Sequence, residues 1–199
     1  MDDVYIKLKI NTVYGKLTGD ASGPLVLAIH GWSKRNGWQT WEPMMGPLAA
    51  AGYCVVSVDM PGWGQSPAID AVPLMGERAA GVVAEIMNGL QKQTAVLLGK
   101  SWGGGVAVQT ALSYPERVTH LVLTAPAVLP SQLPHLGTLS QPVLLAWAED
   151  DPAIPYENAE RLTARIPDVT LETYATGGHE AAQANVADFA PKVIEFLDN

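Results

Sequence analysis

The sequence is poor in several residue types, and each shortage excludes a class of protein. Only one of its 199 residues is a cysteine, Cys54, so no disulfide can form within the chain. Charged residues make up 16% of the sequence, and the 12 Lys and Arg are outnumbered by 20 Asp and Glu, which gives a net charge of −8. Because no basic stripe offsets phosphate repulsion, nucleic acid is not an expected partner.

Long hydrophobic runs are also absent. The longest strongly apolar stretches have the length of a β-strand, so the sequence predicts no membrane span. The acidic start at residues 1–3 is followed by no apolar signal-peptide core. We therefore expect a cytoplasmic protein, and the length favours one domain over residues 1–199.

Apolar strand patterns alternate with helical patterns along the chain. Residues 4–10 alternate apolar and polar side chains, which predicts a half-exposed antiparallel strand paired with residues 12–18. The later strands are expected at 24–29, 53–58, 94–98, 120–124, 142–147 and 170–174. Helical segments are expected at 38–51, 77–90, 104–112, 156–165 and 181–197, the last interrupted by Pro191. This order predicts an α/β fold with a mainly parallel eight-stranded sheet, an N-terminal antiparallel hairpin and helices on both faces.

The pentapeptide at residues 99–103, Gly-Lys-Ser-Trp-Gly, is the most informative motif. It follows an apolar strand pattern and precedes a helix rich in small residues. A G-x-S-x-G sequence in this context is typical of a nucleophile elbow, a turn so tight that the flanking positions must lack bulk. The turn would raise the hydroxyl of Ser101 above the sheet edge, at the N-terminus of the following helix.

A serine nucleophile needs a base and an orienting carboxylate. His179 lies in a glycine-rich loop after the predicted strand 170–174, and strand-end loops of an open α/β sheet meet at the ligand crevice. The other histidines are less well placed, since His120 begins a strand and His135 lies in a proline-rich loop. The turn at 149–151 offers three acids, of which only one can point into the crevice.

These motifs together resemble the α/β-hydrolase fold over nearly the full chain. The residues 30–32, His-Gly-Trp, are similar to the oxyanion loop of that family, and residues 59–66 match its D-x-x-G-x-G-x-S turn. The order Ser, Asp, His is also the order of the family. The resemblance places the acid at Asp151, with Asp150 as the alternative, because Ala148 stands where the family commonly has glycine.

The resemblance implies a catalytic triad and an oxyanion hole. Ser101 would attack an acyl carbonyl, His179 would transfer the proton, and Asp151 would orient the imidazole. The backbone N–H groups of Trp102 and Trp32 would bind the oxyanion. The match at Asp59 implies a structural role, in which this residue holds its turn together. No metal-ligand cluster or phosphate loop is present in the sequence, so neither a metal nor another cofactor is expected.

Further residues near the crevice are candidates for the substrate pocket. Trp38 and Trp63, with the two tryptophans above, could wall an apolar acyl site. Lys34, Arg35 and Lys100 place positive charge near the nucleophile, either simply solvated or selecting an anionic substrate. Only residues 125–141 are available for a cap, which predicts a loop or one short helix and an open, lidless crevice.

The leading functional hypothesis is therefore a serine carboxylesterase that acts on small carboxylic esters. A deacylase or thioesterase acting on amide or thioester acyl groups is one alternative. The other is a non-catalytic binding or adaptor protein on a hydrolase scaffold, because a fold does not fix a function. The sequence leaves the physiological substrate and the oligomeric state open.

Overall fold

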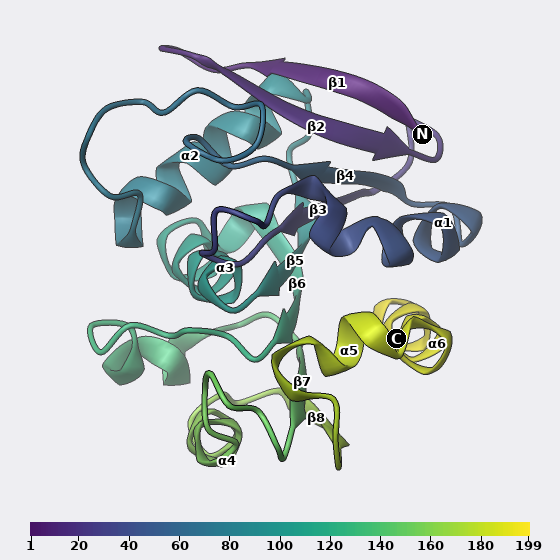
Figure 1. Ribbon diagram of the computed structural model, residues 1–199, viewed down its shortest axis with the longest axis vertical. Coiled ribbons are helices and arrows are strands. Elements are labelled where there is room, and N and C mark those ends of the chain that lie inside the picture. The colour runs from purple at the N-terminus through teal and green to yellow at the C-terminus, as the bar shows by residue number, and fades with distance from the viewer.

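One eight-stranded sheet forms the centre of the computed structural model, which describes residues 1–199 (Figure 1). Its strands are β1 (Asp2–Lys7), β2 (Thr12–Thr18), β3 (Leu25–Ile29), β4 (Cys54–Val58), β5 (Ala95–Lys100), β6 (Val118–Thr124), β7 (Val143–Ala148) and β8 (Val169–Tyr174). Their order in the sheet is β1-β2-β4-β3-β5-β6-β7-β8. β2 pairs antiparallel with β1 and β4, and every other pairing is parallel. The predicted mainly parallel sheet with an N-terminal hairpin is confirmed.

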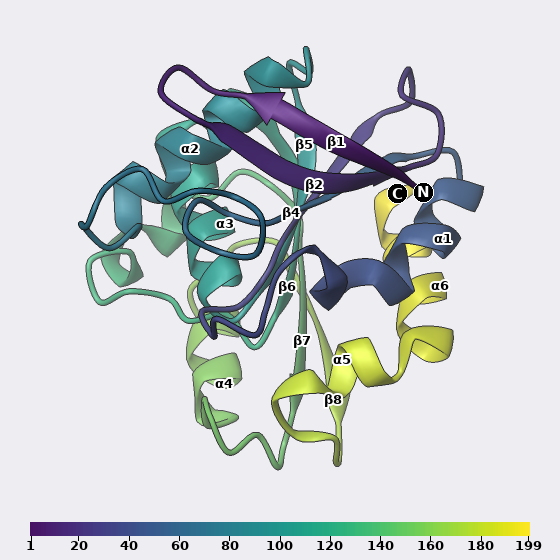
Figure 2. The ribbon, with the colours of Figure 1, turned by 45° about the horizontal axis from the view of Figure 1, so that its top comes forward.

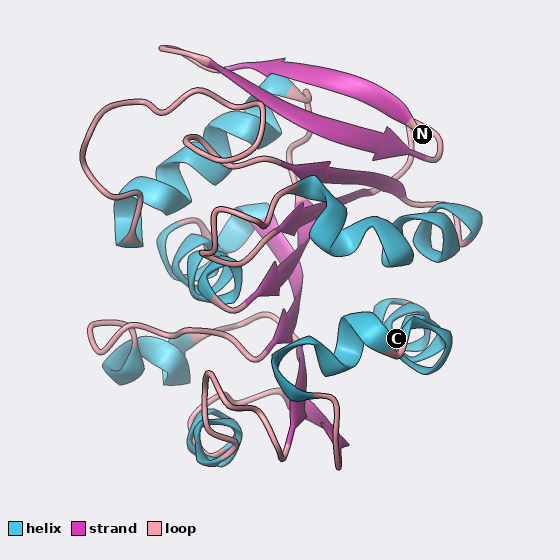
Figure 3. Ribbon diagram, in the orientation of Figure 1, coloured by secondary structure: helices cyan, strands magenta, loops and turns pink.

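Helices cover both faces of the sheet, as predicted. α2 (Gly76–Gly89), α3 (Trp102–Ser113) and α4 (Glu157–Thr163) lie on one face. α1 (Glu42–Ala50), α5 (Ala181–Ala184) and α6 (Val186–Leu197) lie on the other, a division that Figures 2 and 3 also show. Four short 3₁₀ turns complete the set: η1 (Trp38–Trp41), η2 (Pro115–Arg117), η3 (Leu133–Thr138) and η4 (Gly178–Glu180).

Two apolar clusters, one on each side of the sheet, form the core. The strands between them are buried on both faces, and all five residues of β3 and of β4 are buried. This explains why their sequences read as continuous apolar runs rather than as alternating patterns. The larger cluster lies under α2, α3 and α4, and the smaller one lies under α1 and α6.

Two predicted boundaries were wrong for local reasons. β1 ends at Lys7 rather than at residue 10, because the N–H of Leu8 turns back to the carbonyl of Asn11 and leaves Ile10 exposed. The C-terminal helix breaks at Asn185, whose side-chain amide binds the carbonyl of Ala181, and not at Pro191. Pro191 lies inside α6, on its exposed side.

The parallel strands all end at one edge of the sheet, and the loops that follow them build the site described below. Between β6 and β7 the chain forms only loops and η3. This agrees with the prediction that residues 125–141 hold at most one short helix. None of the helices combines the length and the apolar character that a membrane crossing requires.

Candidate active site

Ser101 occupies a strained turn between β5 and α3. Its φ of 53° and ψ of −119° lie in a region that residues with a side chain rarely adopt. The surrounding backbone holds it there, because its N–H donates to the carbonyl of Thr124 at 2.9 Å and its carbonyl accepts from the N–H of Ala127 at 2.7 Å. The segment after β6 therefore fixes the serine from both sides. The side chain stands at the N-terminus of α3, where the helix dipole favours negative charge.

Glycines flank this turn because the backbone passes too close for a side chain. A Cβ atom at Gly99 would lie 2.6 Å from the carbonyl oxygen of Gly103. A Cβ atom at Gly103 would overlap the carbonyl oxygens of Ile29 and His30. The two glycines that the motif requires therefore have separate partners, one within the turn and one at the end of β3.

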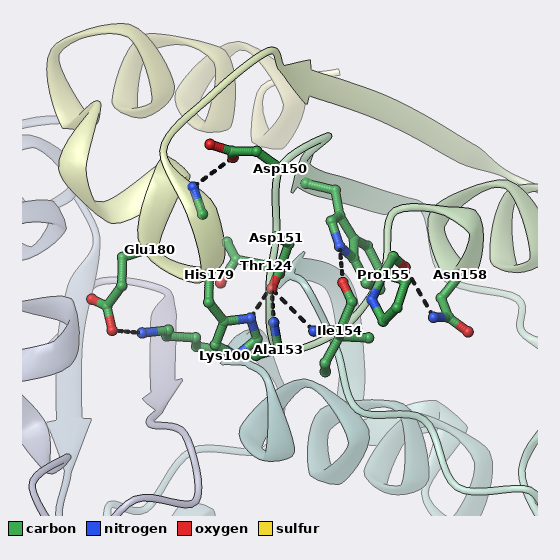
Figure 4. A network of polar contacts seen from close by, with 12 residues as sticks. Lys100, Thr124, Asp150, Asp151, Ala153, Ile154, Pro155, Asn158, His179 and Glu180 are labelled. Atoms are coloured by element: carbon green, nitrogen blue, oxygen red, sulfur yellow. Dashed lines mark hydrogen bonds and ion pairs between the residues drawn. The ribbon is translucent and has the colours of Figure 1, made fainter.

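His179 contacts Asp151 on the turn after β7. The Nδ1 atom of the imidazole lies 2.7 Å from Oδ2 of Asp151, whose side chain is fully buried (Figure 4). The other carboxylate oxygen accepts from the backbone N–H groups of Ala153 and Ile154, at 2.8 and 3.0 Å. These two bonds fix the carboxylate, so that it holds the imidazole with Nδ1 as the donor.

Asp150, the alternative acid, has a different environment. Its carboxylate accepts from the backbone N–H groups of Gly178 at 2.8 Å and Gly177 at 3.3 Å. Both glycines have positive φ, 58° and 123°. Asp150 therefore holds the backbone of the loop that carries His179, while Asp151 holds its side chain.

Lys100, which precedes the serine, is buried rather than solvated. Its side chain is 2% exposed and forms an ion pair with the carboxylate of Glu180 (Figure 4). Its charge is therefore already paired within the protein, and it is not a free cation for a substrate. This contact could not be predicted from the sequence, because the two residues are 80 positions apart.

His30 shapes the loop after β3. Its Nε2 accepts from the N–H of Met60 at 3.1 Å, so Nδ1 carries the proton and donates to the carbonyl of Gly31 at 2.7 Å. Burial of the ring lowers the pKa of His30 to about 4, so the neutral form persists at neutral pH. This neutral imidazole joins the ends of β3 and β4.

The backbone N–H groups of Trp32 and Trp102 are available to a ligand. The N–H of Trp32 donates to no acceptor within the protein. Trp102 is the first residue of α3, so its N–H has no acceptor inside the helix. Gly31, next to Trp32, approaches Ser101 closely, since a Cβ atom there would lie 3.5 Å from the serine Cβ.

Three tryptophans pack together beside the serine and are called the tryptophan cluster below: Trp32, Trp63 and Trp102. The rings of Trp63 and Trp102 stack with centroids 4.7 Å apart, and Trp32 meets both edge-on. Trp63 donates its Nε1–H to the carbonyl of Trp32 at 3.0 Å, whereas the Nε1–H of Trp102 is buried without a partner. Trp32 remains 47% exposed and gives the cluster its open side.

The other residues that the sequence placed near the crevice, Trp38, Lys34 and Arg35, have three different surroundings. Trp38 is placed apart from the tryptophan cluster, against the apolar cluster under α1 and α6 and below the ammonium of Lys16. Lys34 lies 3.9 Å from the ring centroid of Trp63 and donates to the carbonyl of Gly62. Arg35 is exposed and forms no ion pair.

Asp59 has a structural contact pattern. Its carboxylate accepts from the backbone N–H groups of Trp38 at 2.8 Å and Gln65 at 2.9 Å. The aspartate therefore ties the loop after β3 to the turn after β4, which is the role that the sequence predicted for it.

Two cavities adjoin these elements. One, of about 190 Å³, is bordered by Trp32, Lys34 and Trp63 together with the loop that precedes α2. The other, of about 420 Å³, lies between α4 and the segment that follows β6. Its wall is apolar at Val128, Leu133 and Ile154. Arg161 of α4 and Arg165, which lies just beyond the end of that helix, also border it. Sequence reasoning missed these two arginines, because nothing in the α4 pattern marks a cavity.

No group of three or more His, Cys, Asp or Glu side chains is arranged to hold a metal ion.

Some relatives found by sequence comparison match about half of this chain, and others match nearly all of it. The chain is 41% identical over 106 residues to a 2-hydroxy-6-oxononadienedioate/2-hydroxy-6-oxononatrienedioate hydrolase of Burkholderia vietnamiensis, a match that covers 53% of this chain and only 37% of that relative. It is 25% identical to the hydrolase of the same name from Cupriavidus pinatubonensis, with 90% of this chain and 88% of that relative covered. The second alignment has 255 positions and is longer than this chain, so that relative contains residues with no counterpart here.

Structural comparison and the family model agree on the fold. A CIB-like hydrolase from Thermoplasma acidophilum superimposes with a TM-score of 0.89 at 24% identity, covering 98% of this chain and 97% of that one. The family model described as alpha/beta hydrolase fold matches residues 24–138 and 131–182. These two matches meet at the short segment between β6 and β7. Since they extend over most of the sequence, the chain belongs to the alpha/beta hydrolase fold family.

Proposed function

We propose that the protein is a serine hydrolase that cleaves small carboxylic esters through an acyl-enzyme. The observation that carries this proposal is the strained conformation of Ser101, which three separate segments maintain. Strain of this kind costs on the order of 1–3 kcal/mol and persists only where the surrounding structure enforces it. A glycine would adopt this conformation without the strain, so the serine at this position supports a functional role for its hydroxyl.

The proposed reaction uses the residues in the following way. Ser101 Oγ attacks the ester carbonyl while Nε2 of His179 takes its proton, and Asp151 stabilises the imidazolium that forms. The backbone N–H groups of Trp32 and Trp102 bind the oxyanion. His179 then protonates the leaving alcohol, and water hydrolyses the acyl-enzyme by the same steps in reverse order.

The open crevice supports small or protruding substrates. The segment between β6 and β7 contains only loops and η3, so no helical cap covers the serine. The tryptophan cluster offers an apolar surface next to the proposed oxyanion donors. Amide or thioester acyl groups would use the same machinery and remain the alternative substrates.

A second candidate activity comes from the relatives. Several are named as hydrolases of 2-hydroxy-6-oxo dienoates, and one such relative is 41% identical over about half of this chain. We therefore include a substrate of that class beside simple esters in the assay below.

The test combines labelling with turnover. Wild type and Ser101→Ala are treated with a fluorophosphonate probe and assayed on p-nitrophenyl acetate, p-nitrophenyl butyrate and 2-hydroxy-6-oxo-6-phenylhexa-2,4-dienoate. We expect the wild type to be labelled and to turn over the esters, and both signals to vanish in the variant. Turnover of the dienoate alone would favour the second activity. A folded wild type that is neither labelled nor active would favour a binding or adaptor protein.

A further inference from the structure

Lys100 and Glu180 connect the two halves of the site through their positions in the chain. Lys100 immediately precedes Ser101, and Glu180 immediately follows His179. Their ion pair therefore joins the residue before the proposed nucleophile to the residue after the proposed base. In Figure 4 this contact and the His179–Asp151 contact lie on the two sides of the histidine.

The burial of the pair is unequal, which indicates what each residue does. The Lys100 side chain is 2% exposed, and the carboxylate of Glu180 is its one hydrogen-bond acceptor in the protein. The Glu180 side chain is 65% exposed. Burying an ammonium is costly unless a carboxylate compensates it, so the lysine holds the exposed glutamate, and with it the loop, against β5.

The loop that carries His179 has few other restraints. Its glycines at 177 and 178 adopt positive φ, a backbone conformation that side chains disfavour. Asp150 holds the backbone before the histidine, and Gln183 on α5 donates to the hydroxyl of Thr124 at 2.8 Å. These contacts and the His179–Asp151 contact lead to the turn after β7 or to β6, whereas the Lys100–Glu180 pair reaches the end of β5, directly before the serine.

We propose that Lys100 and Glu180 are positioning residues that set the distance and the electrostatic balance between Ser101 and His179. This inference rests on the proposed function, in which the histidine acts as the base. The charged groups around His179 are Asp151 and Asp150 on the turn after β7, Lys100 on β5 and Glu180 beside it.

The pair can be tested with one charge removed and then with both removed. Lys100→Met leaves the Glu180 carboxylate uncompensated beside the imidazole, which favours the protonated, inactive form of the base. We expect the acidic limb of the kcat/KM profile to move to higher pH, and kcat to fall by on the order of 10²-fold with little change in KM. In Lys100→Met/Glu180→Gln the limb returns to the wild-type position while kcat stays low.

Three further variants separate this role from a merely structural one. Lys100→Arg keeps the positive charge, so its kcat/KM profile should have the acidic limb at the wild-type pH. Thr124→Val removes the uncharged tether to α5 and lowers kcat without moving the limb. Lys192→Met breaks the pair of Lys192 with Glu172, in which the lysine side chain is 38% exposed, and leaves both quantities unchanged.

The outcomes also separate this proposal from the proposed function. If the wild type is labelled and active but Lys100→Met has the wild-type limb and kcat, the positioning role is wrong and the serine hydrolase stands. A limb that moves equally in the single and the double variant would also overturn it. Circular dichroism and thermal melting identify any variant that fails to fold, and Lys100→Arg and Thr124→Val then carry the test.

Discussion

The imidazole of His179 is hydrogen-bonded to Asp151 at 2.7 Å, while the adjacent Asp150 contacts only the backbone of the same loop. Two neighbouring carboxylates therefore have separable functions. We expect Asp151→Asn to lower kcat by about 10³–10⁴-fold, because an amide does not stabilise the imidazolium or fix its tautomer. Ester turnover with p-nitrophenyl acetate measures this loss.

Asp150→Asn provides the matched control. It keeps an acceptor for the N–H of Gly178, so we expect a loss of less than about tenfold, as for a single weakened hydrogen bond. Equal losses in the two variants would contradict the assignment of the acid to Asp151.

Trp63 and Trp102 differ in one hydrogen bond, which makes them a useful pair. Trp63→Phe loses the Nε1–H bond to the carbonyl of Trp32 and should lower both kcat and the free energy of unfolding, the latter by about 1 kcal/mol. Trp102→Phe removes an indole N–H that has no partner and should cost less stability. Urea denaturation and ester turnover of both variants give the comparison, and a larger loss of stability in Trp102→Phe would refute it.

His30 makes the stability depend on pH. Its pKa is lowered by burial from 6.5 to about 4, so the unfolded chain binds more protons than the folded one between these values. The stabilisation of the neutral ring is complete above pH 6.5 and is lost as the pH falls toward 4, which amounts to about 3 kcal/mol. We expect His30→Gln to be less stable at pH 7 but to show a flatter dependence of Tm on pH over this window. His135→Gln, at an exposed position, should keep the wild-type slope.

Two glycine replacements compare the steric cost of an added methyl group with the gain in helix propensity. Gly103→Ala places a methyl group against two backbone carbonyls at the end of β3, so we expect it to lower the free energy of unfolding by more than about 2 kcal/mol. Gly46→Ala, inside α1 with open space around the added Cβ, should raise it by about 0.5–1 kcal/mol. Chemical denaturation of the two single variants checks both signs.

The cavity beside α4 predicts a preference for anionic acyl groups. Arg161 lies on α4 and Arg165 lies just beyond its end, both border the cavity, and neither has a carboxylate within ion-pair distance. We expect Arg161→Gln/Arg165→Gln to lower kcat/KM for the p-nitrophenyl monoester of glutaric acid while leaving p-nitrophenyl butyrate unaffected. Arg35→Gln is the control from the oxyanion loop, and an equal loss of both substrates in the double variant would contradict the prediction.

The strand and helix pattern could be predicted from the sequence because the sheet is buried on both faces. Each buried strand is a short apolar run, and glycine at 99 and 103 identifies the turn between β5 and α3. The exact ends were less predictable, since β1 stops where Leu8 bonds to Asn11 and α6 begins at a side-chain bond of Asn185. Such contacts involve single polar groups and leave no periodic pattern.

Only the part of the candidate site that is encoded in sequence motifs and strand ends could be predicted. His179 and Asp151 follow strands, so topology alone brings them to the same edge of the sheet. The burial of Lys100 and its pairing with Glu180 depend on how two distant loops meet, and the position of Trp38 depends on the packing of η1. Neither follows from local sequence.

The backbone of Ser101 is held by Thr124 and Ala127, and the adjacent elbow residue Gly103 packs against the end of β3. The turn at Ser101 is therefore assembled from three stretches that are far apart in the chain, and parallel pairings of this kind form slowly because distant segments must meet first. The onset of fluorophosphonate labelling during refolding would therefore report when the central strands have paired. We expect this onset to come later than the recovery of the helical circular dichroism signal.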